Sequence, residues 1–284
     1  MEESLKKPQV SIIIPTNNSG ETVEECLKSI QGQHYPLCEV IIVDNFSNDS
    51  TLRTAREFGA KIIQHKGNPA QARNIGVNNS SGIYVLFLDS DMILSPTVVE
   101  ECVERCKNEK IGMVIIPEVY VGKGFWSSCS AIWKNCYEEV AYTYRDRRDI
   151  MYHTLPRFFI REEIARAGML DNSLHWGEDY DLYRKLVKIN VREAESKSRI
   201  YHHELTSIRD TMIKNLRYGK SLPVFLQQTS ERARREIFPS MFEHALLTFP
   251  KVFKNSSKSP SVIIGCAILF CIKSYSMMIG LLLE

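Results

Sequence analysis

Residues 83–91, with the sequence IYVLFLDSD, decide the fold class of this chain. The apolar run at residues 83–88 has the length and the β-branched and aromatic content of a buried parallel strand. It ends in Asp89-Ser90-Asp91, although aspartate is depleted inside strands and is costly to bury without a partner. Because open α/β sheets bind ligands at the carboxyl ends of their strands, we expect both carboxylates to face a ligand site. A solvated turn, with one aspartate capping the next helix, is the alternative.

Two carboxylates at the end of a strand suit a hard divalent cation, Mg²⁺ or Mn²⁺. The chain contains a second D-x-D pattern, Asp179-Tyr180-Asp181, within a predicted helix. Residues two positions apart do not share a helix face, so this second pair is not expected to chelate one ion.

Strands and helices alternate on both sides of the central stretch. We predict strands at residues 10–14, 39–43, 60–64, 83–88 and 113–116, and helices at 21–30, 50–58, 70–77 and from Ser95-Pro96 onward. This alternation is typical of βαβ units, a mostly parallel sheet and right-handed crossovers. Polar residues end three of these strands and should therefore converge on one edge of the sheet, where they would form a binding site. They are Thr16-Asn17, Asp44 and the pair Asp89 and Asp91.

The pattern after residue 116 is less regular. We predict an aromatic-rich helix at 125–144, an exposed loop at 145–149, a strand at 157–161, and helices at 162–168 and 177–188. Glu178 and Asp179 would open the last of these helices, where acidic residues are favoured by the helix dipole in any case.

The carboxyl-terminal third is basic and partly apolar. Between Lys197 and Lys258, Lys and Arg outnumber Asp and Glu, which indicates an anionic neighbour such as lipid headgroups or phosphate. Residues 209–221 predict a helix with a basic stripe, and residues 237–253 carry apolar side chains at helical spacing. Residues 261–283 are long enough to span a bilayer, but Lys273 near their middle opposes insertion. We expect a membrane-embedded or interfacial appendage rather than a clean span, with burial in a soluble core as the alternative.

Composition places the chain among ordinary globular proteins. It has 284 residues, of which 44% are hydrophobic and 25% charged, enough for one large domain with an appendage. The eight cysteines show no paired-motif spacing, and residues 1–10 lack a signal-peptide core. We therefore expect a cytosolic, reduced main domain without a disulfide network.

Six short motifs follow one another in a recognisable order. They are PTNN from Pro15, VDNFSNDST from Val43, ARNIG from Ala72, LDSD from Leu88, GEDYDL from Gly177 and YHH from Tyr201. In these motifs the chain resembles the inverting glycosyltransferases of family 2, from about Val10 to His203. The resemblance implies the GT-A fold, a Rossmann-like, mostly parallel sheet flanked by helices. It also implies a division into a disordered lead (1–8), a catalytic domain (9–205, divided at 116/117) and a helical, membrane-associated region (206–284).

The resemblance assigns the donor-binding residues. Pro15, Thr16, Asn17 and Asp44 would meet the nucleotide, although Asp44 could instead cap the helix at residue 50. Arg73 would approach the diphosphate or brace Asp89, a surface salt bridge being the alternative.

The resemblance also assigns the metal ligands. Asp91 would be the direct ligand of Mn²⁺ or Mg²⁺, with Asp89 on the ribose or behind the metal ligand. His202 or His203 would complete the coordination, but neighbouring strand residues point to opposite faces, so only one should reach the ion. The family's Tyr-His pattern favours His202, and a structural role for either histidine is the alternative.

The acceptor side follows from the GEDYDL motif. Asp179 would be the base that takes a proton from the acceptor hydroxyl, and Glu178 would bind the donor or the acceptor sugar. Trp176 would stack on a sugar face or pack as a core aromatic.

The implied activity is metal-dependent, inverting transfer of a sugar from a UDP- or GDP-sugar to a hydroxyl of a glycan, with a lipid-linked glycan as the expected acceptor. The enzyme would work on the cytoplasmic side of the cell membrane and have no nucleic-acid partner. A polyprenyl-phosphate glycosyltransferase is the first alternative, because its acceptor is already ionised and needs no base. An inactive sugar-nucleotide-binding protein and a nucleotidyltransferase are the others, although the chain lacks a Gly-rich phosphate loop near its amino terminus.

Overall fold

The computed structural model describes residues 9–36, 38–143, 155–204, 207–228, 231–256 and 259–283. The chain forms two compact units. The first unit combines Met1–Pro117, Leu155–Ser173 and Glu178–Tyr201, and the second combines Glu118–Thr154, Leu174–Gly177 and His202–Glu284. The domain boundaries predicted from the sequence stay predictions, and the predicted lead and the loop at 145–149 lie outside the described residues.

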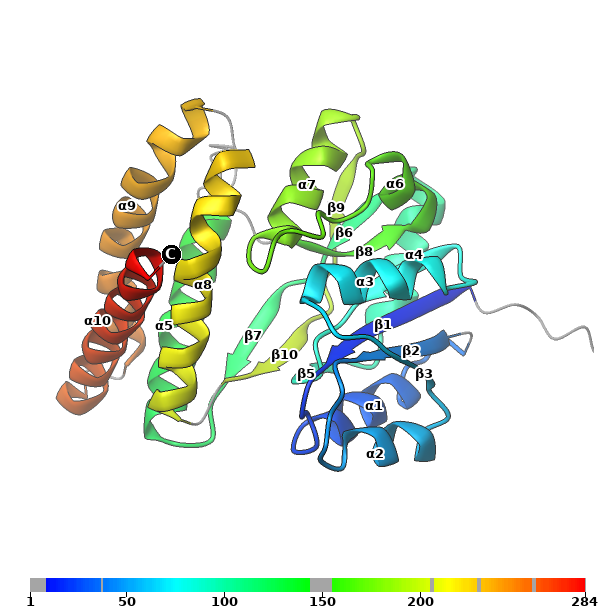
Figure 1. Ribbon diagram of the computed structural model, residues 1–284, viewed down its shortest axis with the longest axis horizontal. Helices are drawn as coiled ribbons and strands as arrows, with labels where there is room; N and C mark the ends of the chain where they lie inside the picture. Colours follow the sequence, from blue (N-terminus) through cyan, green and yellow to red (C-terminus); the bar gives the residue numbers. More distant parts are fainter. Residues whose placement is uncertain are drawn as a thin grey trace, which may run out of the picture. The chain divides into compact units, whose positions relative to one another are not determined.

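A seven-stranded sheet in the order β3-β2-β1-β4-β8-β6-β9 forms the centre of the first unit (Figure 1). Its strands are β1 (Val10–Thr16), β2 (Cys38–Asp44), β3 (Lys61–Gln64), β4 (Tyr84–Phe87), β6 (Met113–Ile115), β8 (Pro156–Ile160) and β9 (Glu193–Glu195). Strands β1 to β4 pair in parallel, as do β6 and β9, whereas β8 is antiparallel to both of its neighbours. The predicted mostly parallel α/β sheet is therefore confirmed.

Helices cover both faces of this sheet. One face packs against α1 (Val23–Gln31), α2 (Thr51–Glu57) and α4 (Val98–Glu109). The other packs against α3 (Pro69–Asn78), α6 (Arg161–Arg166) and α7 (Glu178–Lys188). The side chains of β1 alternate accordingly, with Ile12 and Ile14 in the first core and Ile13 in the second. In Figure 1, α3 and the pair α1 and α2 lie on opposite sides of β1.

Several strand predictions differ from the structure. The central strand is shorter than residues 83–88, because Ile83 is exposed and the chain turns after Phe87. The sequence did not predict β5 (Met92–Leu94), β7 (Glu118–Val121) or β9, since three or four residues are too few to show a period. A second sheet has the strand order β5-β10-β7, in which β10 is Ile200–His203.

The second unit is mainly helical, with α5 (Phe125–Thr143), α8 (Ile208–Gln228), α9 (Glu231–Asn255) and α10 (Pro260–Leu282). Figure 1 shows these four helices side by side. Helices α8 and α10 cross closely at Gly219 and Gly280, where a Cβ on Gly280 would lie 2.2 Å from the carbonyl oxygen of Leu216. Two glycines at one crossing explain how the backbones approach so closely.

Lys273, the charge within the apolar α10, does not protrude from the second unit. Its Nζ donates to Ser130 Oγ on α5 at 2.8 Å, and Ser130 Oγ donates to Glu204 Oε2 at 2.6 Å. Lys134 forms an ion pair with the same glutamate. Lys273 therefore opposes membrane contact less than the sequence indicates, because its charge faces other helices. Among the described residues, α10 is the one helix long and apolar enough to cross a bilayer.

Candidate active site

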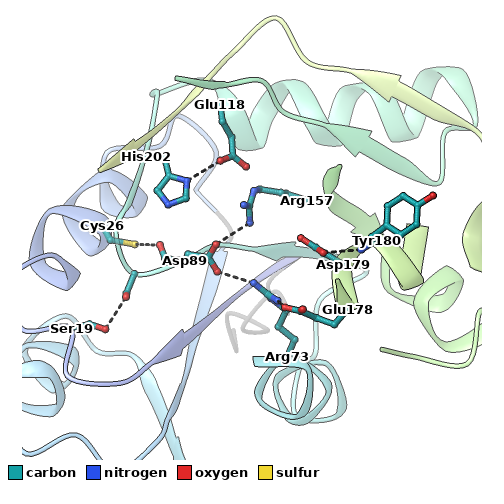
Figure 2. A network of polar contacts seen from close by, with 11 residues as sticks. Ser19, Cys26, Arg73, Asp89, Glu118, Arg157, Glu178, Asp179, Tyr180 and His202 are labelled. Carbon is teal, nitrogen blue, oxygen red and sulfur yellow. Dashed lines mark hydrogen bonds and ion pairs between the residues drawn. The ribbon is translucent and has the colours of Figure 1, made fainter. Parts of the chain in front are cut away.

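Asp89 lies two residues beyond the end of β4 and contacts two arginines (Figure 2). Arg73 Nη2 donates to Asp89 Oδ1 at 2.8 Å, and Arg157 Nη1 donates to Asp89 Oδ2 at 3.3 Å. The Asp89 side chain retains 30% of its exposure, compared with 7% for Arg73 and 16% for Arg157. The expected placement of Asp89 at the strand end is thus observed, and its charge is balanced on two sides.

Arg73 is positioned by a well-capped helix. The Asn68 side chain accepts from Gln71 N at 2.9 Å, Gln71 Oε1 accepts from Asn68 N at 3.1 Å, and Pro69 occupies the first turn of α3. Arg73 lies one turn further along and is buried, so it is not the surface salt bridge considered as an alternative. Arg73 was expected either to approach the diphosphate or to brace Asp89, and the structure shows the contact with Asp89.

Glu178 binds the second arm of Arg73. Arg73 Nη1 donates to Glu178 Oε1, so one guanidinium joins the end of β4 to the start of α7. Burial and the neighbouring Asp179 carboxylate raise the pKa of Glu178, and Arg73 opposes this shift. Burial lowers the pKa of Arg73, but Asp89, Glu178 and Asp179 more than compensate and raise it. The three carboxylates and Arg73 therefore form one electrostatic group.

Asp179 is the exposed member of this group. Its Oδ1 accepts from Tyr180 N at 2.8 Å, which fixes the carboxylate at the first turn of α7. In the view of Figure 2, the Asp179 carboxylate lies between Arg157 and Glu178. Asp181 lies elsewhere on the helix, paired with Lys185 at 2.6 Å, which agrees with the expectation that the second D-x-D does not act as one chelating pair.

Asp44 is fully buried at the end of β2. Its carboxylate accepts from Thr16 Oγ1 at 2.8 Å and from Ser47 N at 2.9 Å, and both donors lie ahead of α2 rather than in its first turn. Asn17 lies beside it on the β1 side, with its Nδ2 donating to the Asn45 carbonyl at 2.8 Å. In the parallel register of β1 and β2, Pro15 pairs with Val43, one position before the pair of Thr16 and Asp44. The predicted nucleotide-binding residues are thus neighbours, as the convergence of strand ends requires.

Asp91 lies near Asp89 on the α1 side. Burial raises the pKa of the Cys26 thiol, and the nearby carboxylates of Asp91 and Asp89 raise it further. The Cys26 Sγ atom lies 3.7 Å from the carbonyl oxygen of Asp89. Ser90, between the two aspartates, donates to Ser19 Oγ at 2.8 Å. Thus α1 and the loop before it hold the acidic turn in place.

The predicted histidine ligands lie in the second unit, whereas Asp91 lies in the first. His202 Nδ1 and Glu118 Oε2 are 2.9 Å apart, and His202 points inward from β10 while His203 is half-buried. A carboxylate on one ring nitrogen is the arrangement that orients metal-binding histidines, so His202 fits the chemistry of a ligand. Among the described residues, no group of three or more His, Cys, Asp or Glu side chains forms a metal site. Joint coordination by Asp91 and a histidine stays a prediction.

Trp176 packs among aromatic side chains of the second unit. Its ring centroid lies 5.4 Å from that of Phe225 and 6.0 Å from that of Tyr218. This packing agrees with the alternative of a core aromatic, while Trp176 remains half-buried. Its stacking on a sugar stays a prediction.

Two charged residues labelled in Figure 2, Arg157 and Glu118, were not predicted as site residues. Arg157 is the single charge in the strand sequence PRFFI, and an isolated cation among apolar strand residues is an unusual signal. Nothing in the sequence around Glu118 points to His202, because the two lie 84 positions apart.

Comparison with known proteins identifies the family. The model of glycosyl transferase family 2 matches residues 11–167. An uncharacterised glycosyltransferase of Rickettsia prowazekii is 27% identical over 222 residues, which cover 73% of this chain and 69% of that protein. Because the family match covers more than half of the chain, the chain belongs to glycosyltransferase family 2, and it is a glycosyltransferase.

Solved structures confirm the fold. The mannosyltransferase PcManGT from Pyrobaculum calidifontis, in complex with GDP-Man and Mn²⁺, superposes with a TM-score of 0.58 at 18% identity, covering 98% of this chain and 86% of that one. Staphylococcus aureus TarS 1–349, in complex with UDP-GlcNAc, gives a TM-score of 0.57 at 15% identity, covering 96% and 89%. The predicted GT-A fold is therefore confirmed.

Proposed function

We propose that this enzyme transfers a sugar from a nucleotide-diphosphate sugar to a hydroxyl of a glycan acceptor with inversion at the anomeric carbon. The observation that carries the proposal is the link from Asp89 through Arg73 to Glu178, which ties the strand end expected to hold the donor to the helix that begins with Asp179. Neighbours of the same fold in complex with GDP-Man and with UDP-GlcNAc support a nucleotide-sugar donor.

On the donor side, the buried Asp44 carboxylate can only accept hydrogen bonds, which suits the N–H groups on the edge of a base. Pro15, Thr16 and Asn17 would shape the same end of the nucleotide, and Asp89 would accept from the ribose. Thr16 and Ser47 hold Asp44 in place, so it is already oriented before a nucleotide arrives.

On the acceptor side, Asp179 would accept the proton of the acceptor hydroxyl as its oxygen bonds to the anomeric carbon. The bond from the anomeric carbon to the diphosphate oxygen breaks, and its electrons leave with the nucleoside diphosphate. Attack from the side opposite the leaving group inverts that carbon. Glu178, buried and paired with Arg73, would keep Asp179 in position at the start of α7.

A divalent cation is part of the proposal. Asp91 would supply a carboxylate and His202, oriented by Glu118, a ring nitrogen, with His203 as the alternative. When bound, Mn²⁺ or Mg²⁺ would stabilise negative charge on the departing diphosphate. The Mn²⁺ complex of PcManGT supports the choice of metal.

We also propose that the second unit associates with the cytoplasmic face of the cell membrane and that the acceptor glycan is carried on a lipid. Exposed apolar side chains gather on its last two helices, among them Leu246 and Phe253 on α9 and Ile264, Met278 and Leu282 on α10. Because Lys273 is engaged inside the bundle, these side chains could enter the interface without burying its charge in lipid. Sedimentation with anionic vesicles tests this, and Phe253→Ser with Met278→Ser should reduce binding.

Asp179→Asn tests the reaction itself. The variant should lose at least about 100-fold in kcat, the usual contribution of a general base, while nucleotide binding is unchanged. Asp181→Asn is the matched control, because Asp181 is a second carboxylate of α7 that pairs with Lys185. Undiminished transfer by Asp179→Asn would remove the base from the proposal, and activity with a bare polyprenyl phosphate would favour the alternative acceptor.

A further inference from the structure

Arg157 occupies an unusual position for a charged residue. It lies on β8, whose residue Phe158 pairs with Leu86 of β4, so Arg157 stands beside the end of the strand that leads to Asp89. Phe158 belongs to one core and Phe159 to the other, and residues two apart on a strand share a face. Arg157 therefore points to the same face as Phe159, the face covered by α3 and α7.

This face already contains Arg73, whose guanidinium contacts two carboxylates. Arg73 donates from Nη2 to Asp89 and from Nη1 to Glu178, and it is buried. Its remaining N–H groups are enclosed with it, since the side chain is only 7% exposed and Nε is buried, so Arg73 is poorly placed to reach a further anion. The contact of Arg157 with Asp89 is weaker, because its length of 3.3 Å exceeds that of the usual charge-assisted hydrogen bond, and the Arg157 side chain is 16% exposed.

The charge balance at this end of the sheet calls for a cation. Five carboxylates of the first unit, Asp44, Asp89, Asp91, Glu178 and Asp179, would repel an anionic donor, and Arg73 with one divalent cation would offset only part of that charge. Arg157 is not the sole cationic partner of Asp89, since Arg73 contacts the same carboxylate at 2.8 Å. A guanidinium has five N–H donors in a planar fork that matches phosphate and carboxylate oxygens, so it can contact Asp89 and a second anion together.

We propose that Arg157 binds an anionic oxygen group of the nucleotide-sugar donor beside Asp89. The inference rests on the proposed donor and adds a binding residue to it. The shared chemistry is a guanidinium with an oxyanion, supplied either by the diphosphate or by a carboxylate on the transferred sugar. In either case the group is fixed next to the strand end at which the donor is expected.

The experiment is a calorimetric titration, in the presence of Mn²⁺, of the wild type and of Arg157→Gln and Arg157→Lys. The ligands are uridine, guanosine, UDP, GDP, UDP-glucose and UDP-glucuronate, the last two differing only in the carboxylate of the sugar. Arg166→Gln is the matched control, because Arg166 lies in the same unit and forms an exposed pair with Glu163.

Arg157→Gln should weaken the preferred nucleoside diphosphate by at least about ten-fold, the factor expected for a hydrogen bond to a charged group, and leave the nucleoside unchanged. Arg157→Lys should recover part of the lost affinity, because lysine keeps the positive charge. This variant still tests the proposal if Arg157→Gln does not fold. A loss confined to UDP-glucuronate would assign the sugar carboxylate as the anion.

Binding of every ligand within about two-fold of the wild type, in whichever variants fold, would overturn the role of Arg157 while leaving the donor proposal intact. A wild type that binds no nucleoside diphosphate or nucleotide sugar would refute both.

Discussion

Replacing Arg73 with methionine should destabilise the first unit substantially. The substitution keeps an unbranched apolar stem but removes the guanidinium that contacts Asp89 and Glu178. Asp89 retains Arg157 and some exposure to water, whereas the Glu178 side chain is only 10% exposed. Removing one partner of a buried ion pair costs about 3–5 kcal/mol, and we expect a loss of that order in the free energy of unfolding.

The loss should depend on pH in a direction set by Glu178. Its pKa in the folded protein is raised, so the folded state binds the proton more tightly than the unfolded state, and stability falls as the pH rises through the raised pKa. Arg73 opposes this shift, so Arg73→Met should raise the pKa further. The deficit of the variant should therefore grow as the pH rises, and should be larger at about pH 8 than at about pH 5.

The readout must report on the correct unit. Trp126, Trp133 and Trp176 all lie in the second unit, so tryptophan fluorescence would follow the wrong part of the chain. Amide hydrogen exchange of β1 and β4 in denaturant, at the two pH values, measures the free energy of opening of the first unit directly.

Two further variants complete the experiment. Adding Glu178→Gln to Arg73→Met should restore part of the loss, because a neutral amide is less costly to bury than an unpaired carboxylate. Arg166→Met, which breaks the exposed pair with Glu163, should cost no more than about 1 kcal/mol. An Arg73→Met protein within about 1 kcal/mol of the wild type, or a deficit equal at both pH values, would refute this view of the Arg73–Glu178 pair.

Three further predictions follow from single contacts. Gly280→Ala should destabilise the second unit by about 1–3 kcal/mol, because the added Cβ would lie 2.2 Å from the Leu216 carbonyl oxygen. Denaturant melts followed by tryptophan fluorescence measure this loss, and a stability equal to that of the wild type would contradict the close crossing of α8 and α10. Asn68→Ala should lower the hydrogen-exchange protection of α3 by about 1 kcal/mol or slightly more. The substitution removes the side-chain cap of α3 and the hydrogen bond from Asn68 Nδ2 to the Asn172 carbonyl, so unchanged protection would argue against both contacts. With a thiol reagent under native conditions, the exposed Cys271 should react first. Cys26 is buried and its pKa is raised, so it should react only when the protein unfolds. Rapid labelling of Cys26 at neutral pH would show that the acidic turn is open to solvent.

The sequence was sufficient to predict the elements that carry their own periodicity. The parallel run from β1 to β4 and the placement of Thr16, Asp44 and Asp89 follow from short apolar runs that end in polar residues, a pattern local to each segment. The GT-A fold followed from the order of such motifs. By contrast, β5, β7 and β9 are too short to show a period, and their existence depends on partners elsewhere in the chain.

The contacts that organise the site could not be read from local pattern. Arg73 and Glu178 are 105 positions apart, and either could equally have been a surface charge or a helix-end residue. The antiparallel insertion of β8 between β4 and β6 depends on long-range pairing, so the position of Arg157 beside Asp89 was invisible until the register was known. The partner of Lys273 could not be predicted for the same reason, because Ser130 is 143 positions away.

The late arrival of β8 has a consequence for synthesis on the ribosome. Strand β4 emerges long before its neighbour β8, since Asp89 and the arginine that β8 brings to it are separated by 68 positions. Until then, β4 presents an open hydrogen-bonding edge, which is a known starting point for aggregation. A nascent chain of this enzyme should therefore depend on chaperones most strongly while the stretch between Pro117 and Leu155 is being translated, and should become independent of them once β8 closes the sheet.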